Sequence, residues 1–248
     1  MSPNAAAEPA LEEVPPGIGI VAPFDLALDR ELWRWTPEAV SLYLTRTPRL
    51  QGPVGVALAE HLADPDAIAA ACGEVAVAEP GVTAYLCTSA SFVAGLEGEA
   101  LLRAAMRRGG ARHALTTSGA VLEALSALGV TRVAVATPYD QALTERLVAF
   151  LAEAGVQTTG SAFLGLGADI WRVGADAVRA LAEAVPRDGA RALVLSCTNL
   201  RTYDVIAPLE AALGIPVVSA NLATMWAALR ALGRLPTGRP ERLFSPTP

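Results

Sequence analysis

Short apolar runs alternate along the chain with longer stretches in which apolar residues recur at helical spacing. The short runs predict buried parallel strands, and the stretches between them predict the helices that cross from one strand to the next. The predicted strands are 17–22, 41–45, 82–86, 113–115, 132–136, 156–163, 192–195 and 217–219. The predicted helices are 64–75, 97–108, 118–128, a stretch that ends at Ala154, 178–185, 204–213 and 221–232.

Polar residues and glycines mark several of the predicted helix ends. Asp64 followed by Pro65 is typical of a helix start, and Ser118 is expected to cap the helix that follows it. Gly109-Gly110 is expected to end the predicted helix 97–108.

The order of predicted elements repeats, so we expect an α/β protein with two pseudo-symmetric halves, each a parallel sheet flanked by helices. The first half covers 17–117 and the second covers 118–219, and a last helix at 220–232 packs back on the first half. The segment 1–16 is predicted to be a disordered leader, and 233–248, with no hydrophobic periodicity, is predicted to be a tail.

Two cysteines occupy matching places in the two halves. Cys87 follows the predicted strand 82–86, Cys197 follows the strand 192–195, and a threonine comes directly after each cysteine. Right-handed crossovers bring the carboxyl ends of parallel strands to one edge of a sheet, where such folds bind their ligands. If the two edges face each other, two thiols flank one small molecule. This arrangement predicts proton transfer at carbon without a cofactor.

The turn after each cysteine also predicts how the thiol is activated. A thiol at a helix N-terminus lies near the positive end of the helix dipole, which is expected to lower its pKa from about 8.5 toward neutrality. The backbone N–H groups of the turns and the hydroxyls of Thr88, Ser89 and Thr198 can hold a carboxylate or a developing enolate.

Other polar residues follow strand ends and are candidates for the same cleft, Asp169 among them. Tyr139 occupies a position after Thr137-Pro138 that is expected to be exposed, where it either ends the strand or offers a hydroxyl donor. Cys72, in an alanine-rich helical run, is expected to be a core residue. The predicted catalytic pair is Cys87 and Cys197, and the predicted substrate-binding residues are Asp25, Thr88, Ser89, Thr117, Tyr139, Thr198, Asn199 and Asn221.

Composition excludes several chemistries. All 19 Lys+Arg residues are arginine, so no lysine is available for a Schiff base with pyridoxal phosphate or for a phosphate-binding loop. Two histidines without metal-type spacing leave little from which to build a zinc site, and we expect no metal and no other cofactor.

Charge and hydropathy limit the partners. The net charge of −6 argues against nucleic acid as a partner, and charged residues interrupt every apolar run before the roughly 18 residues of a membrane span, so no membrane is expected. Three cysteines and no export signal argue against a disulfide framework and predict a cytoplasmic protein.

The cysteine turns and nearby segments resemble the aspartate/glutamate/hydantoin racemase superfamily, and within it the maleate cis-trans isomerase and arylmalonate decarboxylase group. The resemblance covers roughly residues 17–232 and is carried by the two strand-Cys-Thr turns, Thr137-Pro138-Tyr139, the segment 197–202 and Ser219-Ala220-Asn221. It implies two flavodoxin-like halves, an active site between them, no cofactor, a small carboxylate substrate and catalytic cysteines at Cys87 and Cys197. We also expect a homo-oligomer.

Within this group, arylmalonate decarboxylases keep only the second cysteine, so the presence of both here favours an isomerase or a racemase. In the leading hypothesis, a maleate isomerase-like enzyme, the Cys87 thiolate adds to the alkene carbon and Cys197 handles the proton. In an amino-acid or hydantoin racemase, one thiolate removes the α-proton and the opposite thiol delivers one. A cysteine-dependent decarboxylase and a non-enzymatic small-molecule binding module are the remaining alternatives.

One position departs from the maleate isomerase pattern. Maleate isomerases of the group have a neutral asparagine where this chain has Asp25. An unpaired carboxylate beside a dianion costs of order several kcal/mol at low effective dielectric. An aspartate there suits a substrate that carries an ammonium or amide group.

Overall fold

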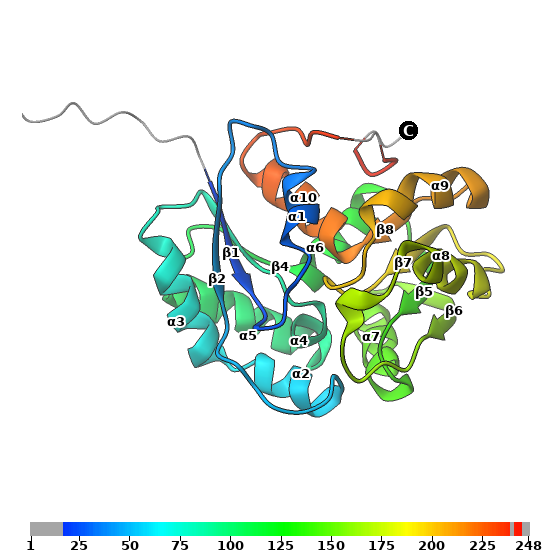
Figure 1. Ribbon diagram of the computed structural model, residues 1–248, viewed down its shortest axis with the longest axis horizontal. Coiled ribbons are helices and arrows are strands. Elements are labelled where there is room, and N and C mark those ends of the chain that lie inside the picture. The colour runs from blue at the N-terminus through cyan, green and yellow to red at the C-terminus, as the bar shows by residue number, and fades with distance from the viewer. Residues whose placement is uncertain (1–16, 239–240, 245–248) are drawn as a thin grey trace, which may run out of the picture.

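Two four-stranded parallel sheets with the same strand order form the framework of the protein (Figure 1). The computed structural model describes residues 17–238 and 241–244, so the predicted leader 1–16 lies outside the described residues. The first sheet has the order β2-β1-β3-β4 and consists of β1 (Ile18–Ala22), β2 (Leu42–Arg46), β3 (Val82–Tyr85) and β4 (Ala114–Thr116). The second has the order β6-β5-β7-β8 and consists of β5 (Arg132–Thr137), β6 (Gln157–Phe163), β7 (Ala192–Leu195) and β8 (Val217–Ser219).

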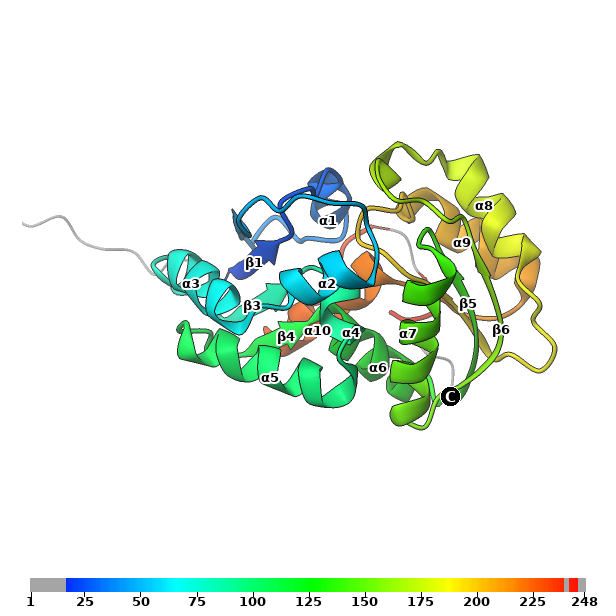
Figure 2. The same cartoon turned by 90° about the horizontal axis from the view of Figure 1, so that it is seen from below.

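Helices flank both sheets (Figures 1 and 2). They are α1 (Asp29–Trp33), α2 (Val56–Leu62), α3 (Pro65–Ala76), α4 (Thr88–Phe92), α5 (Gly95–Arg108), α6 (Thr117–Ala127), α7 (Gln141–Glu153), the 3₁₀ helix η1 (Ile170–Arg172), α8 (Ala175–Ala184), α9 (Tyr203–Leu213) and α10 (Ala220–Ala231). The predicted α/β class, with two parallel sheets flanked by helices, is therefore confirmed.

Alternation of side chains along β1 and β3 divides the core in two. Ile18, Ile20 and Ala22 belong to a large cluster that runs on into the second sheet, whereas Val21 packs with the smaller cluster under α3 and α5. Helix α10 lies within the large cluster and packs on α6, β3 and β4. The core is thus continuous between the two sheets, which keeps their carboxyl edges in a fixed relation.

All eight predicted strands are present, and so are the seven predicted helices, with boundaries that shift by at most a few residues. Asp64 caps α3 as predicted, since its side chain accepts from the N–H of Asp66 at 3.0 Å. The predicted cap at Ser118 was wrong: Thr116 caps α6 by accepting from Gly119 N–H. The short helices α1, α2 and α4 were not predicted, because five to seven residues are too few to establish a helical period.

A buried carboxylate joins the two halves. Glu31 on α1 accepts hydrogen bonds from the N–H groups of Thr202 and Tyr203, which begin α9, and from the side chain of Asn221 on α10. Nearby, Arg34 makes a bidentate pair with Asp204 at 2.7 and 2.8 Å. An acidic side chain at a helix N-terminus also compensates the helix dipole. The short α1 helix therefore acts as a clamp between the halves.

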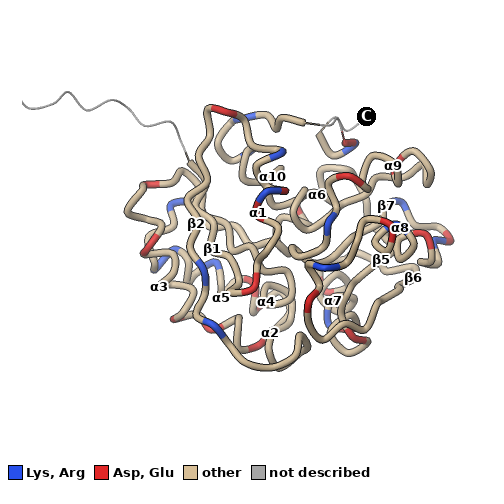
Figure 3. Tube along the Cα trace, in the orientation of Figure 1, with Lys and Arg blue, Asp and Glu red and all other residues tan. Residues whose placement is uncertain are grey.

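Basic and acidic residues are intermixed over the described part of the chain (Figure 3). None of the helices in this described part is long and apolar enough to cross a membrane.

Replacing Glu31 with alanine is expected to lower the free energy of unfolding by about 3 kcal/mol, because several buried N–H donors lose their acceptor. The exposed Glu38 provides the control, and Glu38→Ala should change stability by less than about 0.5 kcal/mol. Urea denaturation followed by circular dichroism measures both. Equal stability of the two variants would contradict the clamp.

Candidate active site

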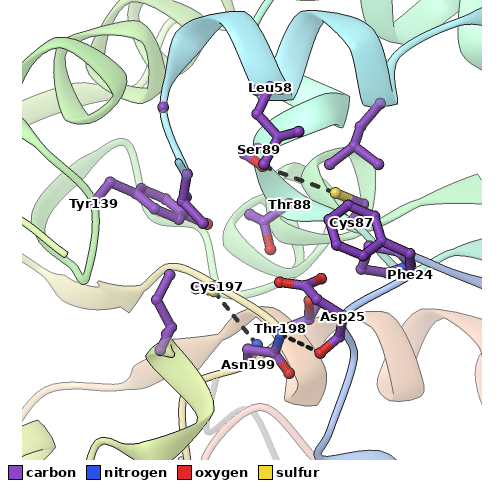
Figure 4. A pocket seen from close by; sticks show the side chains of 16 residues that line it. Phe24, Asp25, Leu58, Cys87, Thr88, Ser89, Tyr139, Cys197, Thr198 and Asn199 are labelled. Atoms are coloured by element: carbon purple, nitrogen blue, oxygen red, sulfur yellow. Dashed lines mark hydrogen bonds between the residues drawn. The ribbon is translucent and has the colours of Figure 1, made fainter. Parts of the chain in front are cut away.

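A pocket lies between the carboxyl ends of the two sheets and is lined from both halves (Figure 4). Its empty space, including the part open to solvent, is about 460 Å³. The lining residues are Pro23, Phe24, Asp25, Val54, Gly55, Leu58, Ala59, Leu62, Cys87, Thr88, Ser89, Tyr139, Ile170, Cys197, Thr198 and Asn199. The structure thus brings both predicted cysteines into one cavity, and with them six of the eight predicted substrate-binding residues.

Cys87 occupies the position between β3 and the short helix α4. Its backbone is extended, with φ −134° and ψ 107°, and it forms the N-cap of α4. Its sulfur lies 3.8 Å from the hydroxyl of Ser89. The thiol is buried at the wall that the first half contributes to the pocket.

Cys197 has an unusual backbone, with a φ of 107° that L-residues rarely adopt. Such a conformation costs of order 1–3 kcal/mol and persists where surrounding contacts impose it. It turns the backbone so that Asn199 N–H points at the Cys197 sulfur at 3.4 Å. The Tyr139 hydroxyl lies near enough to this sulfur for each group to influence the pKa of the other. The Asn199 N–H therefore orients the thiol at the wall contributed by the second half.

The predicted lowering of the thiol pKa was wrong. Burial raises the pKa of Cys87 to about 11 and that of Cys197 to about 12, because both thiols are removed from water. Hydrogen bonds from Ser89 and from the backbone at Ala90 and Asn199 oppose this effect and are outweighed by it. Both catalytic candidates are therefore neutral thiols at neutral pH.

Hydroxyl groups line the pocket between the two thiols. Thr88 is buried, and in the described part of the chain its hydroxyl has no hydrogen-bond partner. A buried polar atom left unpaired is costly unless a ligand or water satisfies it. Thr88 Oγ1 and the neighbouring Ser89 hydroxyl can therefore serve a bound carboxylate.

Tyr139 lines the same pocket, but the prediction that it is exposed was wrong. Its side chain is buried, because the turn after β5 folds it inward to pack against Phe92. Burial raises its pKa well above the ordinary value, so the hydroxyl stays protonated and can donate.

Thr198 and Asn199 fix the architecture of the site. The Thr198 hydroxyl, predicted to bind substrate, donates to Leu86 O at 3.3 Å and so links the second turn to the residue after β3. The Asn199 side chain accepts from Ala27 N–H at 2.9 Å and donates to Asp25 O at 3.1 Å. These contacts fasten the loop after β1 to the cysteine turn of the other half.

Two predicted binding residues are not among those lining the pocket. Thr117 donates to Tyr85 O and accepts from Thr224, so it is a packing contact within the buried interior. The Asn221 side chain donates to Thr198 O and to Glu31, which places it one layer behind the cysteine turn. Their position after strand ends is as predicted, but helices α6 and α10 turn both side chains into the core.

The apolar wall of the pocket was missed by sequence reasoning. This wall is formed by Val54, Gly55 and the α2 residues Leu58 and Leu62, together with Ile170, the first residue of η1. Asp169 itself is exposed and pairs with Arg172. Apolar residues that line a pocket have the same pattern as core residues, so only the Gly52-Pro53 break before α2 could have indicated this wall.

Among the described residues, no group of three or more His, Cys, Asp or Glu side chains is arranged to hold a metal ion. The chemical groups gathered in the pocket are thiols, hydroxyls, backbone N–H groups and one carboxylate, Asp25. This set can bind a carboxylate and exchange protons with a neighbouring carbon.

Comparison with known proteins agrees with this chemistry. A family model described as arylmalonate decarboxylase matches residues 55–241. Arylmalonate decarboxylase from Bordetella bronchiseptica is 41% identical over 172 residues, which is 66% of this chain and 70% of that protein. Maleate isomerase from Nocardia farcinica is 33% identical over 168 residues, or 64% of this chain and 66% of that protein.

Solved structures show the same likeness over nearly the whole chain. A liganded arylmalonate decarboxylase double mutant has a TM-score of 0.83 and 32% identity and covers 94% of this chain and 100% of its own. Maleate isomerase from Pseudomonas putida S16 has a TM-score of 0.78 and 25% identity and covers 88% and 93%. The chain belongs to the arylmalonate decarboxylase and maleate isomerase family of the Asp/Glu racemase superfamily.

Proposed function

We propose that the protein decarboxylates a small α-substituted malonate-type carboxylate, with Cys197 as the proton donor. The observation that carries this proposal is the position of the Cys197 thiol, which is buried in the same pocket as the unpaired Thr88 hydroxyl and whose pKa is raised by that burial. A decarboxylase needs a thiol that gives up a proton to carbon, whereas addition to an alkene needs a thiolate. This favours the decarboxylase alternative over the maleate isomerase hypothesis.

The reaction follows from the arrangement of donors. The bond between the α-carbon and one carboxylate breaks, carbon dioxide leaves, and the electron pair passes into the remaining carboxylate to form an enediolate. Thr88, Ser89 and Tyr139 supply hydroxyl donors for the enediolate oxygens. The S–H proton of Cys197 moves to the α-carbon, and the resulting thiolate recovers a proton from water. The net change is one proton taken up and one carbon dioxide released.

The apolar wall supports loss of carbon dioxide. A carboxylate held against Val54, Leu58 and Ile170 loses much of its hydration, while the neutral carbon dioxide formed from it does not depend on hydration. The wall therefore favours the product over the charged group from which it forms.

The identities of the relatives also favour the decarboxylase hypothesis over the maleate isomerase hypothesis. Arylmalonate decarboxylase is 41% identical to this chain, and the maleate isomerases are 33% identical or less. A maleate isomerase from Nocardia farcinica has been solved with a covalent succinylcysteine, which is the adduct that a thiolate forms. The raised pKa of Cys87 argues against such an adduct as the resting chemistry here.

A second candidate function is racemisation of an α-substituted carboxylate. It is favoured by the presence of Cys87 on the wall of the first half and Cys197 on the wall of the second, in one pocket. An enediolate between them can be protonated from either face. Under this alternative one thiolate removes the α-proton and the other thiol returns a proton.

Replacing Cys197 with alanine is expected to lower kcat for decarboxylation by about 10²–10⁴-fold, since the proton donor is lost. Cys87→Ala should keep decarboxylation within about tenfold of the native rate but abolish α-deuterium exchange of the product in deuterated water. Proton NMR with a panel of α-substituted malonates and monocarboxylates measures both reactions. Cys72→Ala, on the buried face of α3 and outside the pocket lining, is the control. Full activity of Cys197→Ala would exclude the proposed mechanism.

The pH dependence of kcat provides a separate test. Because the pKa of Cys197 is raised to about 12, its protonated form persists as pH rises, and the donor is lost only on approaching that value. The rate should therefore be flat between about pH 7 and pH 9. A reaction that needs a thiolate would instead accelerate about tenfold per pH unit over this range, and that outcome would restore the isomerase hypothesis.

A further inference from the structure

A small cavity adjoins the pocket at Thr88, which lines both. Figure 4 shows Thr88 on the pocket side, between Cys87 and Cys197. The other residues that line the cavity are Ser118, Val121, Leu147, Phe150, Leu151, Val194 and Ser196. The cavity volume open to the centre of a water molecule is about 10 Å³. A single buried water needs about 10–15 Å³ of such space, so the cavity has the size of one water.

Two of the side chains that line this cavity carry unpaired hydroxyls. Thr88 and Ser196 are buried, with 3% and 1% of their surface exposed, and neither hydroxyl has a hydrogen-bond partner among the residues that the structure describes. Leaving a buried hydroxyl unpaired is costly, and a molecule that bonds both of them removes the cost twice. Thr88 belongs to the first half and Ser196 to the second, so such a molecule would lie where the two halves meet.

The other lining residues determine what that molecule is. None of the residues that line the cavity is charged, so a bound ion would have no counter-charge there. Ser118 supplies a third hydroxyl, which donates to Thr88 O at 3.1 Å and accepts from Ser91 Oγ at 2.7 Å, and this leaves it one acceptor site. A buried water typically makes about three hydrogen bonds. Three hydroxyls around the volume of one water therefore suit a water molecule.

Ser196 stands where the first half has an apolar residue. It precedes Cys197 as Leu86 precedes Cys87, and Leu86 is fully buried. A serine in such a place lowers stability unless its hydroxyl is paired. Ser196 also lies close to a donor of the pocket, because burial raises the pKa of Tyr139 well above its ordinary value and Ser196 opposes that effect. A polar residue at this core position points to a role in the site.

Two serine hydroxyls hold the backbone of Thr88. Its carbonyl accepts from Ser91 Oγ at 2.9 Å and from Ser118 Oγ at 3.1 Å. Neither contact fixes the direction of the Thr88 O–H bond, which the proposed function uses as a donor. A hydroxyl donates one hydrogen bond and accepts two. A water that donates to Thr88 Oγ1 therefore leaves the Thr88 hydrogen to point at a carboxylate in the pocket.

From this arrangement we infer that Thr88 and Ser196 hold one buried water between them, and that Ser196 is a positioning residue, which acts through this water on the direction of the Thr88 hydroxyl. The water site rests on the cavity and its hydroxyls, whereas its effect on catalysis rests on the proposed function. A donor that is oriented before the reaction starts stabilises the enediolate without reorganisation.

High-resolution crystal structures of the native protein and of variants test the water site. The native structure should show one water within hydrogen-bond distance of Thr88 Oγ1 and Ser196 Oγ. Ser196→Ala should lose this water, and Ser196→Thr, which keeps a hydroxyl, should retain it. Thr158→Val is the control, because it removes a buried, unpaired hydroxyl of β6 that lies outside the cavity. A dry cavity in the native protein, or a water that stays in Ser196→Ala, would overturn the inference, and the native structure decides the site if Ser196→Ala does not fold.

Kinetics tests the positioning role. Ser196→Ala should lower kcat for decarboxylation about tenfold and leave KM within about twofold, because the oriented donor matters most in the transition state. Ser196→Thr should recover most of the loss, and Thr158→Val should keep the native kcat.

A double-mutant cycle shows whether Ser196 acts through Thr88. The double variant Ser196→Ala with Thr88→Val should be no slower than Thr88→Val alone, since the hydroxyl that Ser196 orients is then absent. Rate losses that multiply in the double variant, or a native kcat in Ser196→Ala, would disprove the positioning role. If no malonate is decarboxylated by the native protein, the proposed function fails, and the crystal structures still decide the water site.

Discussion

The pocket depends on the hydrogen bonds that join the segment after β1 to the turn after β7. Asn199 holds the backbone of Asp25 and Ala27, and Glu31 holds the start of α9. These segments come from different sheets and are far apart in sequence, so only the contact between them places a charged loop of one half beside the cysteine of the other.

Burial between the halves determines the chemistry as well as the shape. A sheet edge open to solvent would allow the donors around Cys87 and Cys197 to favour the thiolates. Enclosed by α2, α4 and the loop after β1, the same thiols lose more from desolvation than they gain from those donors, and both pKa values rise. The pocket therefore suits a reaction in which a thiol supplies a proton, as the proposed function requires.

Much of this arrangement follows from local sequence patterns. Apolar runs predicted every strand, and the strand-Cys-Thr turns predicted that Cys87 and Cys197 would lie at sheet edges. The orientation of side chains could not be predicted in the same way. Tyr139 and Asn221 follow strands as Asp25 does, but tertiary packing turns Asn221 into the core and buries Tyr139 at the pocket wall. The sign of the thiol pKa shift also depends on burial, which local patterns do not report.

The pseudo-symmetry of the fold does not make the two thiols equivalent. Cys87 has an extended backbone at the N-cap of α4 and contacts the Ser89 hydroxyl, whereas Cys197 has a positive φ and accepts from the Asn199 N–H. The strained turn at Cys197 aims one thiol by backbone conformation, and such precision is most valuable for the group that delivers a proton to carbon. The two copies of one strand-turn pattern thus differ in geometry, and this difference supports the proposal that Cys197 is the proton donor.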